Sequence, residues 1–89
     1  MTFKFNISPE LRKRLDKLAR KDRNLAIAVR QKIQQIISCD KTAIDHYKNL
    51  RGAMSSFKRV HVGSFVLLFK VEGDTIVFDR FVHHDDAYN

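Results

Sequence analysis

The stretch FKRVHVGSFVLLFKVEGDTIVFDRFVHHDDAY, residues 57–88, decides the fold. Within it, three runs rich in β-branched and aromatic residues predict β-strands. These runs span residues 57–62, 65–71 and 75–83. Gly63-Ser64 suits a two-residue type II′ hairpin turn, and Gly73-Asp74 suits a second turn of the same length. The stretch therefore predicts three antiparallel strands followed by a short polar tail.

If both turns have two residues, the pairing assigns every side chain to one face of the sheet. The face expected to meet the helices carries Val60, Val62, Phe65, Leu67, Phe69 and Val71. The opposite, open face carries Arg59, His61, Val66, Leu68, Lys70, Val77, Asp79, Phe81 and His83. This pairing puts Arg80 on the helix side. A β-bulge would exchange the faces of part of a strand, so the assignment depends on unbroken pairing.

The residues before this stretch predict a scaffold for the sheet. Apolar and polar residues alternate over 2–7, which is typical of a half-buried strand. Ser8, followed by a proline, suits the N-cap of a first helix. A second helix, capped by Asp22 or Asn24, runs to about Ser38. The turn between the helices is short, so we expect an antiparallel helical hairpin that lies on the sheet.

Residues 39–56 predict less regular structure. We expect a helical turn within 42–47, and then a loop in which Leu50 is buried and Gly52 allows a bend. The element order is then β-α-α-β-β-β, an α+β fold. Its sheet is twisted and rich in antiparallel pairs, and the N-terminal helical hairpin packs on one face. The length suits one core, so residues 1–89 predict a single domain.

The composition is strongly basic. The chain has 17 Lys and Arg against 10 Asp and Glu, a formal net charge of +7. This charge favours a polyanionic partner, such as nucleic acid, an acidic protein segment or an anionic membrane surface, over a merely basic surface. The single Cys39 excludes an internal disulfide and a cysteine-based zinc site. No apolar run is long enough to span a membrane, and the N-terminus lacks the apolar core of a signal peptide. We expect a cytoplasmic protein without a membrane partner.

Three motifs in this order resemble the RelE/ParE superfamily of toxins from bacterial and archaeal toxin–antitoxin pairs. Leu50-Arg51-Gly52 resembles the family's Leu-x-Gly before the second strand. RVHVGSF at 59–65 resembles its Arg-x-Arg-Val-Gly-Asp-Tyr hairpin, and HHDDAY at 83–88 resembles its His-Arg-x-x-Val-Tyr ending. Within the superfamily the match is nearer to RelE. The resemblance implies a RelE-like toxin domain that acts as a ribosome-dependent mRNA endoribonuclease and inhibits translation.

The resemblance also implies the chemistry and the partners. RelE-like cleavage needs no metal or other cofactor, because the 2′-hydroxyl of the RNA attacks the adjacent phosphate. A base must take the hydroxyl proton, cations must stabilise the phosphorane, and an acid must protonate the leaving 5′-oxygen. The expected partners are the ribosome, its mRNA and a cognate antitoxin that neutralises the toxin.

Carried onto this chain, the resemblance implies a catalytic set of Arg59, His61, His83 and Tyr88. Arg59 would contact the phosphate bidentately, and His61 would act as base or acid. Tyr88 would stack on a base or take part in proton transfer. The expected RNA-binding residues are Lys48, Arg51, Lys58, Arg80 and His84.

One departure from the family pattern supports an alternative. Val66 stands where RelE-type toxins place an arginine, and the pairing puts it across from His61. A non-catalytic member of the fold, such as a ParE-like gyrase inhibitor or a degenerate RNA-binding protein, fits this loss of a cation. His83 and His84 are adjacent on a strand and point to opposite faces, so they do not chelate one ion, and no metal site is expected.

Overall fold

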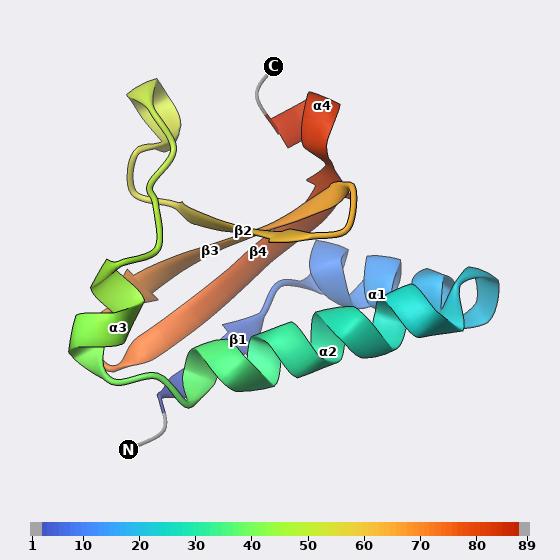
Figure 1. The fold of residues 1–89 in the computed structure, drawn as a ribbon, viewed down its shortest axis with the longest axis horizontal. Coiled ribbons are helices and arrows are strands. Elements are labelled where there is room, and N and C mark those ends of the chain that lie inside the picture. Colours follow the sequence, from blue (N-terminus) through green and yellow to red (C-terminus); the bar gives the residue numbers. More distant parts are fainter. Residues whose placement is uncertain (1–2, 88–89) are drawn as a thin grey trace.

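The computed structural model describes residues 3–87, and it is built around one four-stranded sheet (Figure 1). The strands lie in the order β1-β4-β3-β2. They are β1 (Lys4–Ile7), β2 (Lys58–Val62), β3 (Phe65–Glu72) and β4 (Thr75–His83). β1 runs parallel to β4, and the other neighbouring strands are antiparallel. The predicted α+β fold with the order β-α-α-β-β-β is confirmed.

Two helices, α1 (Pro9–Lys21) and α2 (Arg23–Ile37), form the predicted hairpin. The Ser8 hydroxyl accepts the N–H of Leu11 and so caps α1. Asp22 accepts the N–H of Leu25 and caps α2, and the same residue ends α1, so the helices meet at a single residue. No helix within residues 3–87 is long and apolar enough to cross a membrane.

The main core lies between this hairpin and one face of the sheet. Leu11 and Leu15 of α1 and four residues of α2 pack against β2, β3 and β4. The α2 residues in this core are Val29, Ile33, Ile36 and Ile37, and the strand residues are Val62, Leu67, Phe69, Ile76, Phe78 and Phe81. Three phenylalanines in this core are fully buried, so burial here specifies which sheet face meets the helices.

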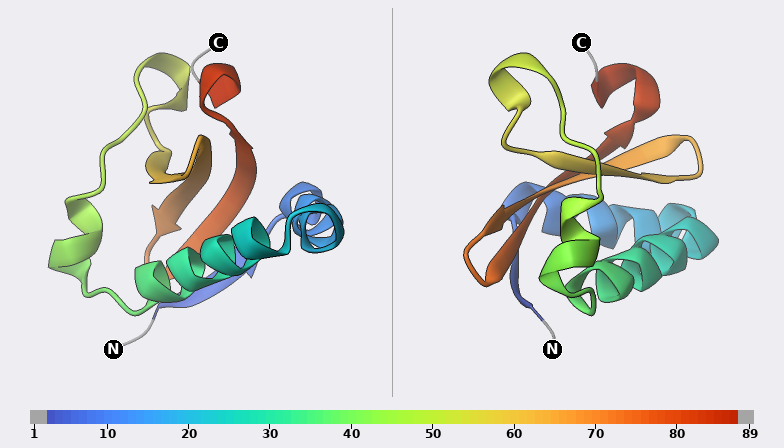
Figure 2. Two further views of the ribbon diagram at one scale, coloured as in Figure 1. Left: turned by 45° about the vertical axis from the view of Figure 1, so that its right-hand side comes forward. Right: turned by 60° about the vertical axis from the view of Figure 1, so that its left-hand side comes forward.

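The other face of the sheet carries a smaller cluster. Leu50, Val66 and Leu68 are buried together, and Met54 and Phe57 pack against them. The loop that supplies Leu50 and Met54 contains a short 3₁₀ helix, η1 (Gly52–Met54), and follows α3 (Lys41–Asp45). In both views of Figure 2 this loop and α4 (His84–Ala87) stand on the side of the sheet opposite α1 and α2. The predicted burial of Leu50 is confirmed.

The β2–β3 hairpin has the predicted register. His61 pairs with Val66, and Val62 pairs with Phe65 across a two-residue turn. Gly63 has a φ of +61°, and glycines alone have positive φ among the described residues, so Ser64 does not. This combination is that of a type II′ turn.

The β3–β4 hairpin departs from the predicted register halfway along. It begins regularly, with Glu72 opposite Thr75, but the register shifts between Leu68 and Phe69. Asp79 is the extra residue of a β-bulge there, since Phe69 pairs with Phe78 and Leu68 pairs with Arg80. Compared with the predicted pairing, every residue of β4 after Asp79 therefore lies on the other face of the sheet.

This bulge corrects three predicted positions. Phe81 pairs with Leu67 and lies in the main core, so its prediction on the open face was wrong. His83 pairs with Phe65 and therefore shares the helix-facing side, not the face of Arg59 and His61. Arg80, predicted on the helix side, pairs with Leu68 and lies on the open face.

Candidate active site

Two arginines flank the centre of the open face. Leu68 of β3 pairs with Arg59 of β2 on one side and with Arg80 of β4 on the other. Neighbouring strands lie about 4.8 Å apart, so the backbones of the two arginines are separated by about 10 Å. The carboxylate of Asp79, at the bulge, accepts a hydrogen bond of 2.7 Å from Nε of Arg80. Two arginines whose backbones are this far apart can direct their guanidinium groups at one phosphate group from opposite sides.

The floor between these arginines is apolar. Val66 and Leu68 are buried, and Leu50, Met54 and Phe57 of the loop pack against them. Val66 is 0% exposed, so it offers no surface to a substrate. Polar contacts on this face must therefore come from its rim, where Arg59, His61 and Arg80 lie.

A pair of histidines forms one end of the rim. The rings of His61 and His84 stack with their centroids 5.5 Å apart and their planes at 28°. The backbone N–H of His84 donates to the carbonyl of Ser64 over 3.0 Å, which ties the start of α4 to the β2–β3 turn. Nδ1 of His84 lies 3.7 Å from the Asp85 carboxylate. Imidazole can take or give a proton near neutral pH, so the pair brings two acid–base groups to one place.

His83 lies apart from this pair. Its ring meets the edge of Phe65 with the centroids 5.4 Å apart, on the helix-facing side of the sheet. Its Nδ1 accepts the backbone N–H of Asp85 over 3.3 Å. The structure thus brings His84, and not the predicted catalytic His83, to His61.

Lys58 is also turned away from the open face. It pairs with Phe69, and its ammonium donates to the carbonyl of Tyr47 and to Oδ1 of Asn49. Burial, with a further contribution from Cys39, raises the pKa of the Tyr47 phenol above its ordinary value. The neutral Tyr47 ring packs edge-on against Phe69. Through its bonds to Tyr47 and Asn49, Lys58 therefore holds the start of the loop in place.

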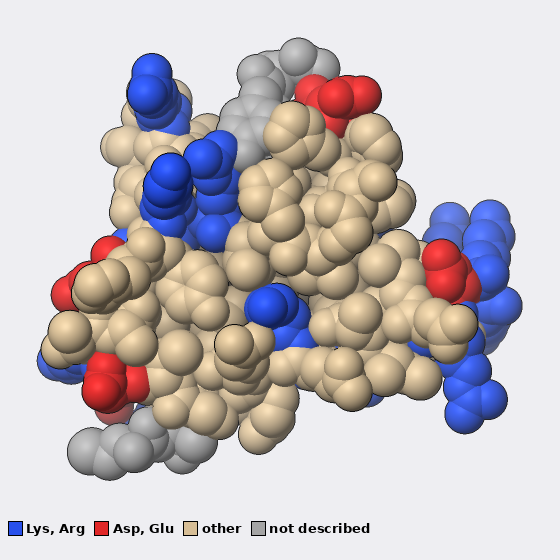
Figure 3. All heavy atoms as spheres, viewed as in Figure 1, with Lys and Arg blue, Asp and Glu red and all other residues tan. Residues whose placement is uncertain are grey.

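The remaining predicted residues lie in the loop or outside the described chain. Lys48 and Arg51 are exposed on the loop that precedes β2. Figure 3 shows Lys and Arg side chains gathered at the upper left, over this loop and β2. Tyr88 lies outside the described residues. Within residues 3–87, no three His, Cys, Asp or Glu side chains group in a way that would hold a metal ion.

The placement of Arg80 and His84 was missed because the bulge was missed. Phe78 and Phe81 are three residues apart in a strand, and both are large aromatic residues. Regular alternation cannot bury both on one face, whereas one extra residue between them can. The polar pair Asp79-Arg80 lies where that extra residue is needed. The spacing of the two phenylalanines was the signal.

With this geometry established, comparison with known proteins identifies the family. Residues 5–88 match the model of the family described as "ParE toxin of type II toxin-antitoxin system, parDE". The chain belongs to this toxin family. A protein of Methanocaldococcus jannaschii named "Putative toxin RelE4" is 39% identical over 97% of this chain and 90% of its own length. The predicted membership of the RelE/ParE superfamily is thus confirmed.

Solved structures of toxins have the same fold. YafQ of Escherichia coli superposes with a TM-score of 0.71 and 18% identity, covering 98% of this chain and 99% of YafQ. A chain of the toxin–antitoxin complex RelBE2 of Mycobacterium tuberculosis superposes with a TM-score of 0.68 and 19% identity, over 94% and 100% of the two chains. At these identities the likeness concerns the fold alone.

Proposed function

We propose that this toxin is a ribosome-dependent mRNA endoribonuclease whose active site is the rim of the open face. The observation that carries the proposal is the stacked pair of His61 and His84 beside a face flanked by Arg59 and Arg80. Cleavage of RNA without a bound cofactor needs two proton-transfer groups and cations at the phosphate. The rim offers both.

In the proposed reaction, one histidine of the pair acts as base and the other as acid. The base takes the proton of the 2′-hydroxyl while the 2′-oxygen forms a bond to the adjacent phosphorus. The bond from phosphorus to the 5′-oxygen breaks, and the acid gives its proton to that oxygen. The products are a 2′,3′-cyclic phosphate and a free 5′-hydroxyl. Arg59 and Arg80 stabilise the charge that develops on the phosphorane.

The proposed chemistry keeps some of the roles that were predicted from the sequence and changes others. Arg59 and His61 keep their predicted catalytic roles, His84 replaces His83, and Arg80 moves from RNA binding to the phosphate. Lys48 and Arg51 are left to bind the RNA backbone beside the site. Lys58 holds the loop.

We also propose a cognate antitoxin as the partner that neutralises this toxin. The RelBE2 chain of similar fold was solved in a toxin–antitoxin complex, which supports such a partner. With a net charge of +7, the toxin favours a segment rich in Asp and Glu. Such a segment would fold on the toxin as it binds.

Translating ribosomes test the proposed function. Wild-type protein is added to ribosomes on a defined mRNA, and primer extension maps the 5′ ends that form. We expect new ends within the codon held in the A site and no such ends on the same mRNA without ribosomes. Intact mRNA in both reactions would overturn the catalytic proposal.

A second candidate, inhibition of DNA gyrase, is favoured by the ParE description of the matching family. The apolar floor at Val66 also supports it, since a binding surface does not need a cation there. A supercoiling assay separates the two candidates. Loss of supercoiling together with intact mRNA on ribosomes would favour the gyrase inhibitor.

A further inference from the structure

A cationic stripe runs along the exposed side of α1. Residues three and four positions apart lie on one side of a helix, and such a series lines a shallow groove here. Its members are Glu10, Lys13, Arg14, Asp16, Lys17, Leu18 and Lys21. Of these, Lys13, Arg14, Lys17 and Lys21 are the cations, and we call them the α1 stripe.

Within residues 3–87, no ion pair neutralises the charge of this helix. α1 holds six Lys or Arg side chains against two carboxylates, so it accounts for +4 of the net +7 of the chain. None of the ion pairs formed within residues 3–87 involves a side chain of α1. Cations gathered in this way repel one another, and a polyanion relieves that repulsion.

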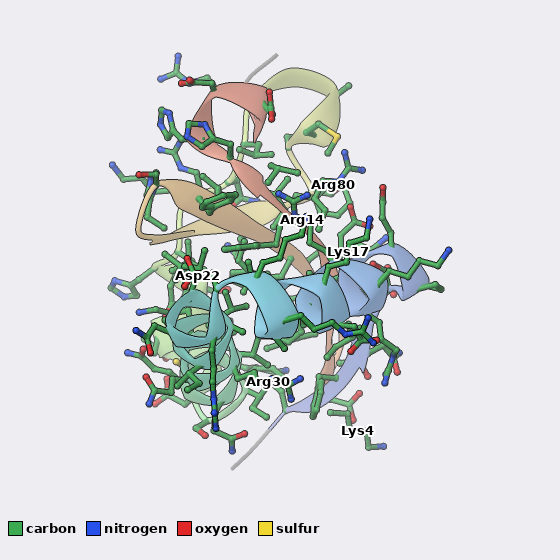
Figure 4. The ribbon with its side chains drawn as sticks, turned by 90° about the vertical axis from the view of Figure 1, so that its right-hand side faces the viewer. Lys4, Arg14, Lys17, Asp22, Arg30 and Arg80 are labelled. Atoms are coloured by element: carbon green, nitrogen blue, oxygen red, sulfur yellow. The ribbon has the colours of Figure 1, made fainter. Side chains whose placement is uncertain are left out.

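The α1 stripe is held rigidly to the strand that carries Arg80. The N–H of Ser8 donates to the carbonyl of Phe78, and the Ser8 hydroxyl donates to the carbonyl of Asp79, at the bulge. The guanidinium of Arg14 lies 5.8 Å from the centre of the Phe65 ring, at the start of β3. Figure 4 shows Arg14 and Lys17 on the side of α1 that is turned toward Arg80 of β4. The stripe therefore has a fixed position relative to the open face.

We propose that the α1 stripe binds the phosphate backbone of RNA outside the cleavage site. Phosphate contacts require cations but no apolar pocket. Lys13, Lys17 and Lys21 follow one another at about 6 Å of helix rise, as a row of point charges along a backbone. The RNA is either the ribosomal RNA around the A site or a further part of the mRNA. The inference rests on the proposed function, which supplies an RNA-rich target.

The composition of the stripe favours RNA over an acidic protein segment. Tight protein interfaces depend on buried aromatic or aliphatic anchors. The groove over α1 offers a single apolar side chain, Leu18, which is already packed against the main core. A peptide bound there would find charge but little apolar surface to bury, whereas a phosphate backbone needs only the charge.

The test compares two triple variants with the same net charge. K13Q/K17Q/K21Q removes three cations of the α1 stripe, and K4Q/K32Q/K41Q removes three from β1, α2 and α3. Glutamine keeps a helix propensity close to that of lysine, and circular dichroism checks that both variants fold. Binding to small ribosomal subunits that hold no mRNA is measured over a range of salt concentrations, so no cleavage is needed.

Each phosphate contact contributes about 0.7 to 0.9 to the slope of log K against log salt. We expect K13Q/K17Q/K21Q to reduce that slope by about 2 to 3 and to weaken binding on the order of 10²-fold at 0.1 M salt. K4Q/K32Q/K41Q should change the slope by less than about 1. Equal losses in both variants, or none in the first, would overturn the inference, since net charge alone would then explain binding.

Two further probes identify the polyanion. A short single-stranded RNA tests the mRNA as its source: if K13Q/K17Q/K21Q weakens binding to subunits but not to this RNA, the stripe binds ribosomal RNA. Because these subunits hold no mRNA, weakened binding to both means that the stripe binds the phosphate backbone of ribosomal RNA and of mRNA alike. Polyglutamate tests an acidic protein segment, and a larger loss for polyglutamate than for either RNA would overturn the inference. If the wild type binds subunits through the stripe and leaves mRNA intact, the proposed function fails while the stripe stands.

Discussion

The two hairpins of this sheet begin alike and end differently. Both turn on two residues, and the glycines that open the turns, Gly63 and Gly73, have φ values of +61° and +63°. The β2–β3 hairpin then pairs without interruption, whereas the β3–β4 hairpin contains a bulge at Asp79. The turn sets the register only as far as the first bulge, so equal turns do not make equal hairpins.

The bulge serves both the core and the candidate active site. It lets Phe78 and Phe81 lie on the same face, where both are buried. In the same step it turns Arg80 to the open face, opposite Arg59 across Leu68. The carbonyl of Asp79, at the bulge, also accepts the Ser8 hydroxyl, and the carbonyl of Phe78 accepts the Ser8 N–H. These two bonds hold the start of α1 against β4. One extra residue thus couples packing of the core to placement of a cation.

The largest effect is expected where the shifted register buries an aromatic ring. Phe81→Ala removes a side chain that is 1% exposed and stacked on Phe65, so we expect a loss of about 3–5 kcal/mol in the free energy of unfolding. Urea denaturation measures it. Phe5→Ala is the control, because Phe5 is 45% exposed and its truncation should cost less than about 1 kcal/mol. Similar costs would mean that Phe81 is not in the core.

The next effect separates two adjacent histidines. His84 stacks on His61, whereas His83 lies on the other face against Phe65. Under the proposed function, His84→Ala should slow cleavage of mRNA on ribosomes by at least about 10²-fold, because one proton-transfer group is lost. His83→Ala should leave the single-turnover rate within about threefold. The reverse ranking would restore the unbroken register of β4 that the sequence suggested.

A smaller effect is expected at the contact between α1 and the bulge. Ser8→Ala removes the N-cap of α1 and the hydrogen bond to the carbonyl of Asp79, each worth about 1 kcal/mol, so we expect a loss of about 2 kcal/mol. Ser38→Ala is a matched control, because the Ser38 hydroxyl donates to the carbonyl of Gln34, four residues earlier in α2, and so ties no second element to its helix among the described residues. Thermal unfolding compares the two. A loss at Ser8 no larger than at Ser38 would show that the bulge stands without this support.

The features that the sequence predicted correctly depend on local rules. The cap at Ser8, the type II′ turn at Gly63 and the burial of Leu50 each follow from a few neighbouring residues. The features it missed depend on residues distant in the chain. The bulge turns His84 to the open face, where its N–H bonds to the carbonyl of Ser64 beside His61. The ammonium of Lys58 is held by Tyr47 and Asn49, which lie about ten residues earlier in the chain. The alternation of apolar residues predicts a strand, but it does not predict where a bulge shifts the pairing with the neighbouring strand.

The smallest effect concerns the feature that the two hairpins share. An added Cβ at Gly63 or Gly73 meets nothing within 4 Å, so substitution by alanine strains only the backbone. For both Gly63→Ala and Gly73→Ala we expect a loss of about 1 kcal/mol, the cost of a left-handed conformation in a residue with a side chain. Equilibrium denaturation should find the two losses equal within about 0.5 kcal/mol, since the two glycines have nearly the same φ and the same open surroundings. A clearly larger loss at Gly63 would show that its turn, which also accepts the N–H of His84 through Ser64, is more than a reversal of the chain.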